Sequence, residues 1–272
     1  MACEGFLDRE PVFTGSDLAV YLRGRGVVGA EAAAGRLGVL WQEQGRVVAV
    51  GSGVWAVVDD GGPVEGFQPL PYLVGSKLAP DAVLSHRSAV EFWGLSYTMW
   101  FEVVYSATRP VPETVYGVMR YRGVRFPDRL VERGNQHVEV VEKDFAGGTV
   151  RVATMERTLV DVMAAPHLGG DWDENCRSLS VADTYDIKKV VGYCDVLDAG
   201  PELRARVGFF LDHNRHLWGF GDADLAAFRP RRPYPGAPFR LSPRTGGPCL
   251  TVTDWHLEVP TYVLRRGWEA FQ

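Results

Sequence analysis

The chain has 272 residues, enough for one large domain or two of ordinary size. Apolar residues make up 46% and charged residues 23%, a balance that excludes a disordered, collagen-like or coiled-coil chain. No apolar run approaches the roughly 18 residues that cross a bilayer, and the N-terminal segment is acidic where a signal peptide is basic. We therefore expect a cytoplasmic protein without a membrane partner.

The formal net charge of -5 gives no overall attraction for nucleic acid, so any DNA contact must come from a local patch. The charge is uneven. Residues 1–60 carry five basic and eight acidic side chains, whereas residues 227–272 carry seven basic and three acidic ones. The four cysteines form no CxxC pair, so neither a zinc site nor a disulfide framework is expected. No glycine-rich phosphate loop occurs, and we expect no cofactor.

The first sixty residues predict two helices followed by a hairpin. Thr14 or Ser16 is a good N-cap for a helix that ends near Arg23. A second helix is expected over residues 29–44, where small and apolar residues recur at steps of three and four. Two β runs, 46–50 and 54–58, are joined by a Gly-Ser-Gly turn. This order is typical of a winged helix-turn-helix, which we assign to residues 1–60.

In such a module the second helix enters the major groove and the wing lies along the phosphate backbone. The candidate DNA-binding residues are Arg23, Arg25, Arg36, Arg46 and Ser52. The alternative is a protein-interaction module whose winged helix docks a protein partner. The acidic charge of the segment favours that alternative, because phosphate neutralisation supplies most non-specific DNA affinity.

Residues 59–63, Asp-Asp-Gly-Gly-Pro, interrupt both helix and strand and predict a domain boundary or linker. Residues 65–272 then predict a larger mixed domain, in which strands are followed by helices and again by short strands, so the fold class is α+β. The expected strands cover 102–107, 115–126, 137–142, 149–153 and parts of 250–264. The expected helices cover 81–93, 154–164, 173–182, 186–197, 201–213 and 222–228.

Three polar clusters stand out in this domain, and each has a simple structural explanation. Ser85 or Ser88 beside His86 lacks a partner acid at a telling spacing, and a packed helix explains these residues better. Arg157 and Asp161 lie four residues apart, the spacing of an ion pair on a helix surface.

The third cluster is Asp186-Ile187-Lys188, which resembles a metal-dependent nuclease triplet but starts an expected helix rather than lying on a strand. His213 and His216 could share a metal, but no third ligand is evident. We therefore expect neither catalytic residues nor a metal site.

The C-terminal region is rich in arginine and proline. Its basic residues form a candidate contact patch for nucleic acid or an acidic partner, or a solvated loop that balances the acidic residues 134–186. The patch consists of Arg229, Arg231, Arg232, Arg240 and Arg244.

Three segments carry a resemblance to a known family: LSHRSAVEFWGL at 84–95, RVATMERTLVDVM at 151–163 and GFFLDHN at 208–214. Together with the hairpin-tipped N-terminal module, they resemble the AbiEi antitoxins of AbiE-type (type IV) toxin–antitoxin systems. The resemblance runs from Phe13 to about Asn214.

The resemblance implies a two-domain, non-enzymatic antitoxin with a role in phage defence. Its winged helix would bind inverted repeats of operator DNA and repress its own operon, with two modules, as in a homodimer, on the two half-sites. Its C-terminal domain would counteract a nucleotidyltransferase-like toxin, with or without direct contact. This module departs from the family pattern because it is net acidic.

Overall fold

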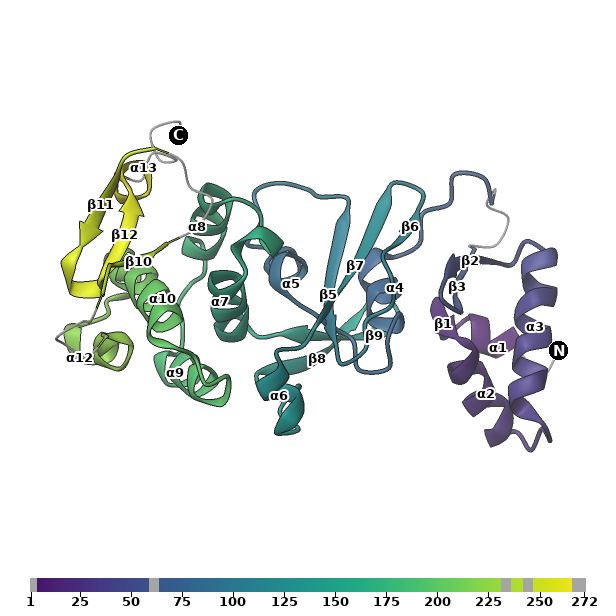
Figure 1. The fold of residues 1–272 in the computed structure, drawn as a ribbon. Coiled ribbons are helices and arrows are strands. Elements are labelled where there is room, and N and C mark those ends of the chain that lie inside the picture. Colours follow the sequence, from purple (N-terminus) through teal and green to yellow (C-terminus); the bar gives the residue numbers. More distant parts are fainter. Residues whose placement is uncertain (1–3, 59–63, 231–235, 242–246, 266–272) are drawn as a thin grey trace. The chain divides into compact units, whose positions relative to one another are not determined.

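The computed structural model describes residues 4–58, 64–230, 236–241 and 247–265 (Figure 1). The chain forms two compact units whose segments alternate along the sequence. Unit 1 comprises Met1–Leu84, Trp100–Phe126 and Val141–Val152, and unit 2 comprises Ser85–Met99, Pro127–Val140 and Ala153–Gln272. The linker expected at residues 59–63 lies outside the described residues, and the boundary expected near residue 60 falls inside unit 1.

Unit 1 begins with the predicted winged helix-turn-helix. Its elements are α1 (Glu4–Leu7), β1 (Val12–Thr14), α2 (Gly15–Gly24), α3 (Ala30–Glu43), β2 (Val47–Gly51) and β3 (Val54–Val57). The strands form an antiparallel sheet in the order β1-β3-β2. Thr14 caps α2 as expected: its side chain accepts a hydrogen bond from the Asp17 amide, and the Asp17 carboxylate accepts one from the Thr14 amide.

Aromatic rings hold this module together. Phe6 and Phe13 meet edge to face with centroids 5.1 Å apart, and Phe13 stacks on Trp55 at 5.8 Å. Trp41 of α3 packs against the same rings and is buried. Such pairs stabilise a small core beyond the area that they bury. The core fixes which side of α3 faces inward.

The rest of unit 1 is a six-stranded mixed sheet covered by one helix (Figure 1). The helix is α4 (Pro71–Lys77), and the sheet order is β6-β7-β5-β4-β9-β8. The strands are β4 (Val83–Leu84), β5 (Glu102–Ala107), β6 (Thr114–Tyr116), β7 (Met119–Arg125), β8 (Val140–Phe145) and β9 (Gly148–Ala153). A Cβ on Gly75 would lie 2.7 Å from Val103 Cγ1, so α4 can approach the sheet this closely only because residue 75 is glycine.

Unit 2 is mainly helical. Its helices are α5 (His86–Phe92), α6 (Asp128–Glu132), α7 (Met155–Ala164), α8 (Trp172–Ser180), α9 (Ile187–Val196), α10 (Pro201–His213), α11 (Arg215–Trp218), α12 (Asp222–Leu225) and α13 (Thr261–Leu264). A small sheet, β10-β12-β11, closes its C-terminal end with β10 (Phe239–Arg240), β11 (Cys249–Val252) and β12 (Leu257–Pro260) (Figure 1). The core contains Leu159, Tyr193, Phe210 and Trp255. The α+β class predicted from the sequence is confirmed.

Some expected elements differ from the structure. The segment 81–93 is not one helix, because Val83 and Leu84 form β4 and pair with Ser106 and Tyr105 of β5. The strand expected over 115–126 is divided at residues 117–118 into β6 and β7. The final stretch contains the expected strands and then the short helix α13.

Candidate nucleic-acid interface

Helix α3 has one buried and one exposed side. Ala30, Ala34 and Trp41 are buried in the module core. The opposite side of the helix carries Ala32, Gly35, Arg36 and Val39, all exposed. In a winged helix-turn-helix this exposed side is the one that meets base edges.

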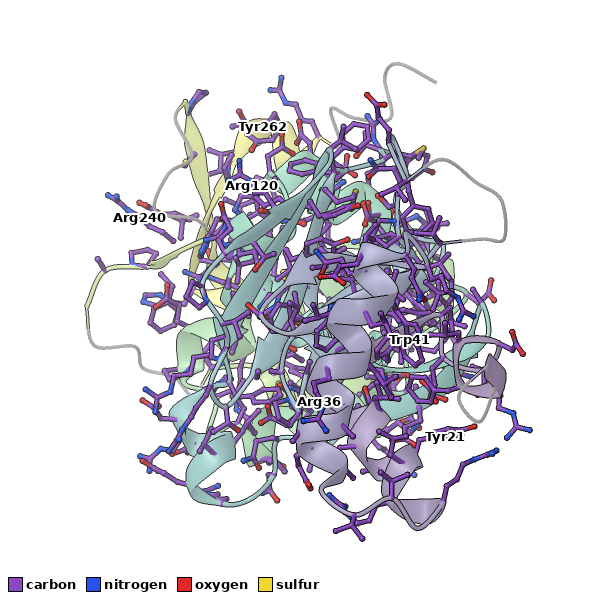
Figure 2. The ribbon with its side chains drawn as sticks, turned by 90° about the vertical axis from the view of Figure 1, so that its right-hand side faces the viewer. Tyr21, Arg36, Trp41, Arg120, Arg240 and Tyr262 are labelled. Carbon is purple, nitrogen blue, oxygen red and sulfur yellow. The ribbon has the colours of Figure 1, made fainter. Side chains whose placement is uncertain are left out.

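Arg36 supplies the only positive charge on this exposed side of α3, and it is labelled on that helix in Figure 2. Within the part of the chain that the structure describes, its guanidinium has no ion-pair partner. An exposed, uncompensated guanidinium retains its donors for a ligand, and its planar fork suits phosphate or guanine. Among the predicted contact residues, Arg36 is therefore the one that lies on the exposed side of α3.

Arg23 and Arg25 are engaged at the turn between α2 and α3. The Arg23 guanidinium forms an ion pair with the Glu31 carboxylate in the first turn of α3. Backbone and Arg23 hydrogen bonds hold the pKa of Glu31 below its usual value. The Arg25 guanidinium lies over the ring of Tyr21, 4.7 Å from its centroid. Both side chains are exposed, and an exposed ion pair such as Arg23–Glu31 contributes little to stability.

Arg46 and Ser52 lie at opposite ends of β2. The Arg46 amide donates to the Trp41 carbonyl, which places this half-buried residue just after α3. Ser52 is the exposed tip of the wing, with a φ of 51° between Gly51 at 129° and Gly53 at 75°. Three successive positive φ values require glycines around the tip. The five predicted residues therefore surround α3 instead of forming one cluster.

A cleft of about 840 Å³ lies within unit 1 beside α3 and the wing. Its cations are already neutralised: Lys77 Nζ lies 3.0 Å from Asp17 Oδ2, and Arg151 Nε lies 3.6 Å from Glu142 Oε1. Arg151 also donates to the Pro80 carbonyl at 3.0 Å. The cleft lining thus offers hydroxyls and the Trp55 indole, and both of its cations are compensated by carboxylates.

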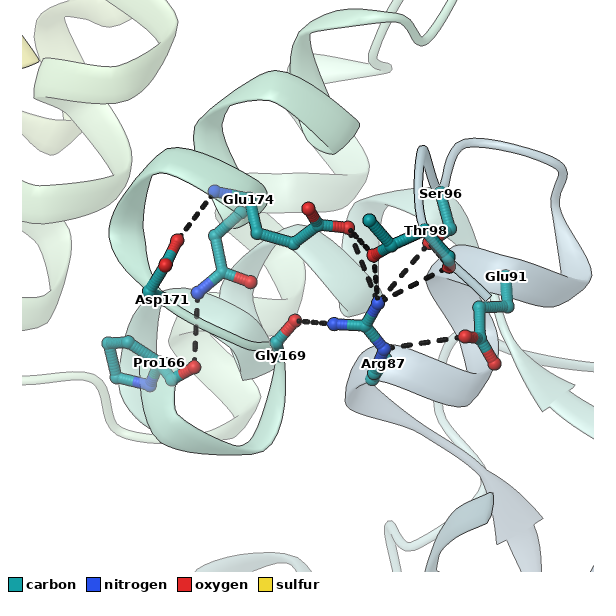
Figure 3. Close-up of polar contacts among 9 residues, drawn as sticks. Arg87, Glu91, Ser96, Thr98, Pro166, Gly169, Asp171 and Glu174 are labelled. Atoms are coloured by element: carbon teal, nitrogen blue, oxygen red, sulfur yellow. Dashed lines mark hydrogen bonds and ion pairs between the residues drawn. The ribbon is translucent and has the colours of Figure 1, made fainter. Parts of the chain in front are cut away.

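In unit 2 the segment 85–95 contributes a buried arginine and its partners (Figure 3). Arg87 is 1% exposed. Its guanidinium donates to the Gly169 carbonyl at 3.0 Å and to Thr98 Oγ1 at 2.8 Å. It also lies 3.3 Å from the carboxylates of both Glu91 and Glu174. Burial lowers the pKa of Arg87, while the two carboxylates oppose that shift.

The pair Arg157–Asp161 is buried, so the interpretation as a surface ion pair is wrong. Arg157 Nε lies 3.2 Å from Asp161 Oδ2, and Arg157 is 1% exposed. Nη1 of the same guanidinium donates to the Gln136 and Val138 carbonyls at 2.7 and 2.8 Å. The Tyr193 hydroxyl donates to Asp161 Oδ1 at 2.8 Å. The pair therefore joins α7 and α9 to the segment that precedes β8.

The side chains of Ser85 and His86 contact each other at the start of α5. Ser85 precedes α5, and His86 Nδ1 lies 3.0 Å from Ser85 Oγ. His86 has a φ of 49°, an uncommon conformation for a residue other than glycine. Both side chains are buried.

Two further sequence candidates, Asp186 and His213, make local contacts. Asp186 caps α9, because its carboxylate accepts hydrogen bonds from the Lys188 and Lys189 amides. The His213 ring stacks on Phe209 at 5.4 Å. Among the described residues, no group of three or more His, Cys, Asp or Glu side chains is placed to hold a metal ion.

The arginine patch expected in the C-terminal region is only partly described. Arg231, Arg232 and Arg244 lie outside the described residues. Arg229 sits over the Trp255 ring at 4.9 Å and pairs with Asp222, and Arg240 pairs with Glu258 at 3.5 Å. Its two described members therefore bind within unit 2.

Three residues of this exposed side, Ala32, Gly35 and Val39, are not among the contact residues predicted from the sequence. These residues are small or apolar, so a search for basic residues does not identify them. A helical projection of residues 30–43 separates them from the buried set, and that signal could have identified the exposed stripe.

No protein-family model matches the chain, and no curated protein sequence matches it. A solved structure is similar in fold: the RV2827C protein from Mycobacterium tuberculosis, at 18% sequence identity and a TM-score of 0.57. The match covers 96% of this chain and 91% of that one. Searching the described residues, we find that no helix has both the length and the apolar character of a membrane span.

Proposed function

We propose that this protein is an antitoxin-type transcriptional regulator that binds operator DNA through its winged helix. The observation that carries the proposal is the complete module: α2 and α3 packed on the sheet β1-β3-β2, with a glycine-flanked wing and, on the exposed side of α3, an arginine that has no ion-pair partner among the described residues. Counteraction of a nucleotidyltransferase-like toxin rests on the AbiEi resemblance, and we assign that role to the part of the chain after the module.

Operator DNA with inverted repeats would be bound by two modules. A recognition helix covers one half-site, and two copies related by a twofold axis read a palindrome. Phosphate contacts would come from the module's exposed arginines and from the backbone of the wing tip. Repression of its own operon follows if the repeats overlap the promoter.

A second candidate is a protein-docking module. Several large apolar side chains of the module are exposed, including Val28 in the turn between α2 and α3 at 97%. Where such side chains form a contiguous patch, the patch is typical of a protein interface. The acidic charge of residues 1–60 also fits a basic protein partner better than it fits phosphate.

Fluorescence anisotropy of the full chain with DNA from upstream of its own operon separates the two candidates. Regulator function requires tight binding that weakens with salt and exceeds binding to a scrambled duplex of equal length. Absence of binding at low salt would reject the DNA proposal and favour a protein partner. Co-expression with a neighbouring nucleotidyltransferase-like protein tests the antitoxin role: growth should be rescued only when this chain is present.

A further inference from the structure

The exposed side of α3 carries mostly small and apolar residues, which is unusual for a surface that would contact DNA. Ala32, Arg36 and Val39 follow one another at steps of four and three residues, so their side chains form one line along the helix. Gly35 lies beside this line, and Val39 is 53% exposed. We call these four residues the α3 stripe.

The chemistry of the α3 stripe is limited to one donor group and apolar surface. Arg36 is its only polar side chain, flanked by the methyl groups of Ala32 and Val39. Glu31, on the neighbouring side of the helix, is already paired with Arg23. The line continues to Glu43 only in the last turn, beyond the N-terminal part of the helix that meets bases.

Each base pair presents a different pattern in the major groove. Guanine offers two acceptors that suit an arginine fork, and thymine offers a methyl group that suits an apolar side chain. Adenine is read best by asparagine or glutamine, and cytosine by a carboxylate. The α3 stripe contains the partners of guanine and thymine and lacks those of adenine and cytosine.

We infer that the α3 stripe reads a guanine through Arg36 and adjacent thymine methyl groups through Ala32 and Val39. This inference rests on the DNA-binding role proposed above and adds the sequence class of the half-site.

Gly35 is consistent with a close approach of α3 to the bases. A Cβ built on Gly35 would meet no atom within 4 Å, so the protein itself does not demand glycine at this position. A helix interior normally disfavours glycine. Its missing side chain lets the α3 backbone lie close to the floor of the groove.

The test compares two forms of the same DNA. Duplexes of about 20 base pairs, tiled across the upstream region, are made with thymine or with deoxyuridine, which lacks only the 5-methyl group. We expect uracil to weaken binding about fourfold for each contacted methyl, the factor that corresponds to ~0.8 kcal/mol per buried carbon group. Replacing guanine by 7-deazaguanine should weaken binding at the position that Arg36 reads.

A pair of variants assigns the effect to the stripe. Val39→Ala should bind thymine DNA more weakly and show a smaller difference between the thymine and uracil duplexes. Val20→Ala is the matched control, since Val20 is 62% exposed on α2 and outside the stripe. It should retain the full wild-type difference.

The outcomes separate the inference from the function on which it rests. Failure of the wild type to bind any tiled duplex overturns the DNA-binding proposal itself. Equal binding to thymine and uracil DNA overturns the inference and leaves DNA binding intact. A Val39→Ala variant that changes the oligomeric state but keeps the full uracil effect would also overturn it, because the stripe would then be a protein interface.

Discussion

The effect of an arginine on stability depends on whether its guanidinium group is buried or exposed. Arg87 and Arg157 each have a carboxylate four residues further along the chain, the spacing of a weak surface pair. In the structure both guanidinium groups are almost fully buried and also donate to backbone carbonyls of distant segments. A sequence contains the i,i+4 spacing but not the burial. Burial makes the loss of either partner costly, because the other charge is then left without compensation.

Arg87→Met should destabilise unit 2 strongly. The substitution preserves most of the side-chain volume but leaves the carboxylate of Glu174 and the carbonyl of Gly169 without the guanidinium. Breaking a buried pair in this way costs about 3–5 kcal/mol. For a chain of this size that lowers the Tm by about 10 °C, measurable by thermal unfolding followed by circular dichroism.

Arg129→Met is the control for this prediction. Arg129 is 56% exposed in α6 and pairs with Glu132 and Asp198 at the surface. Its removal should change stability by less than about 0.5 kcal/mol. Equal effects of the two variants would mean that the Arg87 network does not stabilise the fold.

The cysteines predict a graded thiol reactivity. Burial raises the pKa of Cys194 to about 12, so hardly any thiolate forms near neutral pH. Cys249 is exposed on β11, whereas Cys176 is buried. In a Cys3→Ser variant, alkylation of the native protein followed by peptide mass spectrometry should label Cys249 alone. Rapid labelling of Cys194 before unfolding would contradict its burial.

At the scale of helices, a glycine can be required by close packing or can lie in open space, and the sequence alone does not distinguish the two cases. Gly35 and Gly38 of α3 both weaken an isolated helix. A Cβ on Gly38 would lie 3.0 Å from the Trp55 ring, whereas one on Gly35 would meet nothing within 4 Å. Gly38 therefore allows α3 to pack on β3, while packing within the module does not explain Gly35.

Unit 2 also contains one closely packed and one unobstructed helical glycine, and their substitution tests the packing through stability. A Cβ on Gly208 of α10 would lie 2.2 Å from a Trp255 ring carbon, whereas one on Gly192 of α9 would meet nothing within 4 Å. Gly208→Ala should lower the free energy of unfolding by about 1–3 kcal/mol through overpacking. Gly192→Ala should raise it by up to about 1 kcal/mol.

Urea unfolding of both variants measures the difference. Stabilisation by Gly208→Ala would show that α10 and Trp255 are not packed as closely as the structure places them. Destabilisation by Gly192→Ala would show that α9 does not expose this position.

Helices with a clear capping residue or a proline in the first turn could be predicted from the sequence. A strand that is defined only by its pairing in a sheet could not. Helix α10 begins at Pro201 and ends at His213 as expected, because proline at the first turn marks its start. Thr154 caps α7 through a hydrogen bond from the Arg157 amide. Strand β4 was missed because two apolar residues have no recognisable period, and only their pairing with β5 defines them.

The candidate site was predicted in outline from the same local signals. Helix α3 and the wing follow from periodicity and from glycines, and Arg36 follows from its charge. The engagement of Arg23 with Glu31 and of Arg25 with Tyr21 depends on how the turn between α2 and α3 folds. The Arg23–Glu31 contact joins residues eight positions apart, so only coordinates reveal it. Tyr21 and Arg25 lie four positions apart at the end of α2, a spacing that the sequence does contain.

At the scale of the whole molecule, a net charge of -5 has to be reconciled with the anionic ligand that we propose. Long-range attraction is absent, so DNA binding must depend on a few exposed arginines at short range. Such a protein should show a shallow dependence of affinity on salt, because each neutralised phosphate contributes about 0.9 to the slope.

Two substitutions in the full chain should therefore affect binding in different ways. Arg46→Ala should weaken operator and scrambled DNA alike and reduce the salt slope by about 1, as expected for a phosphate contact. Arg36→Ala should weaken the operator more than the scrambled duplex, by about 1–3 kcal/mol, because a base contact carries sequence information. Arg129→Ala, on the surface of unit 2, should change neither affinity nor slope. If Arg36→Ala and Arg46→Ala both behave like Arg129→Ala while the wild type still binds, the DNA lies on another face of the molecule, since an acidic protein cannot lose a base contact and a phosphate contact without a measurable loss of affinity.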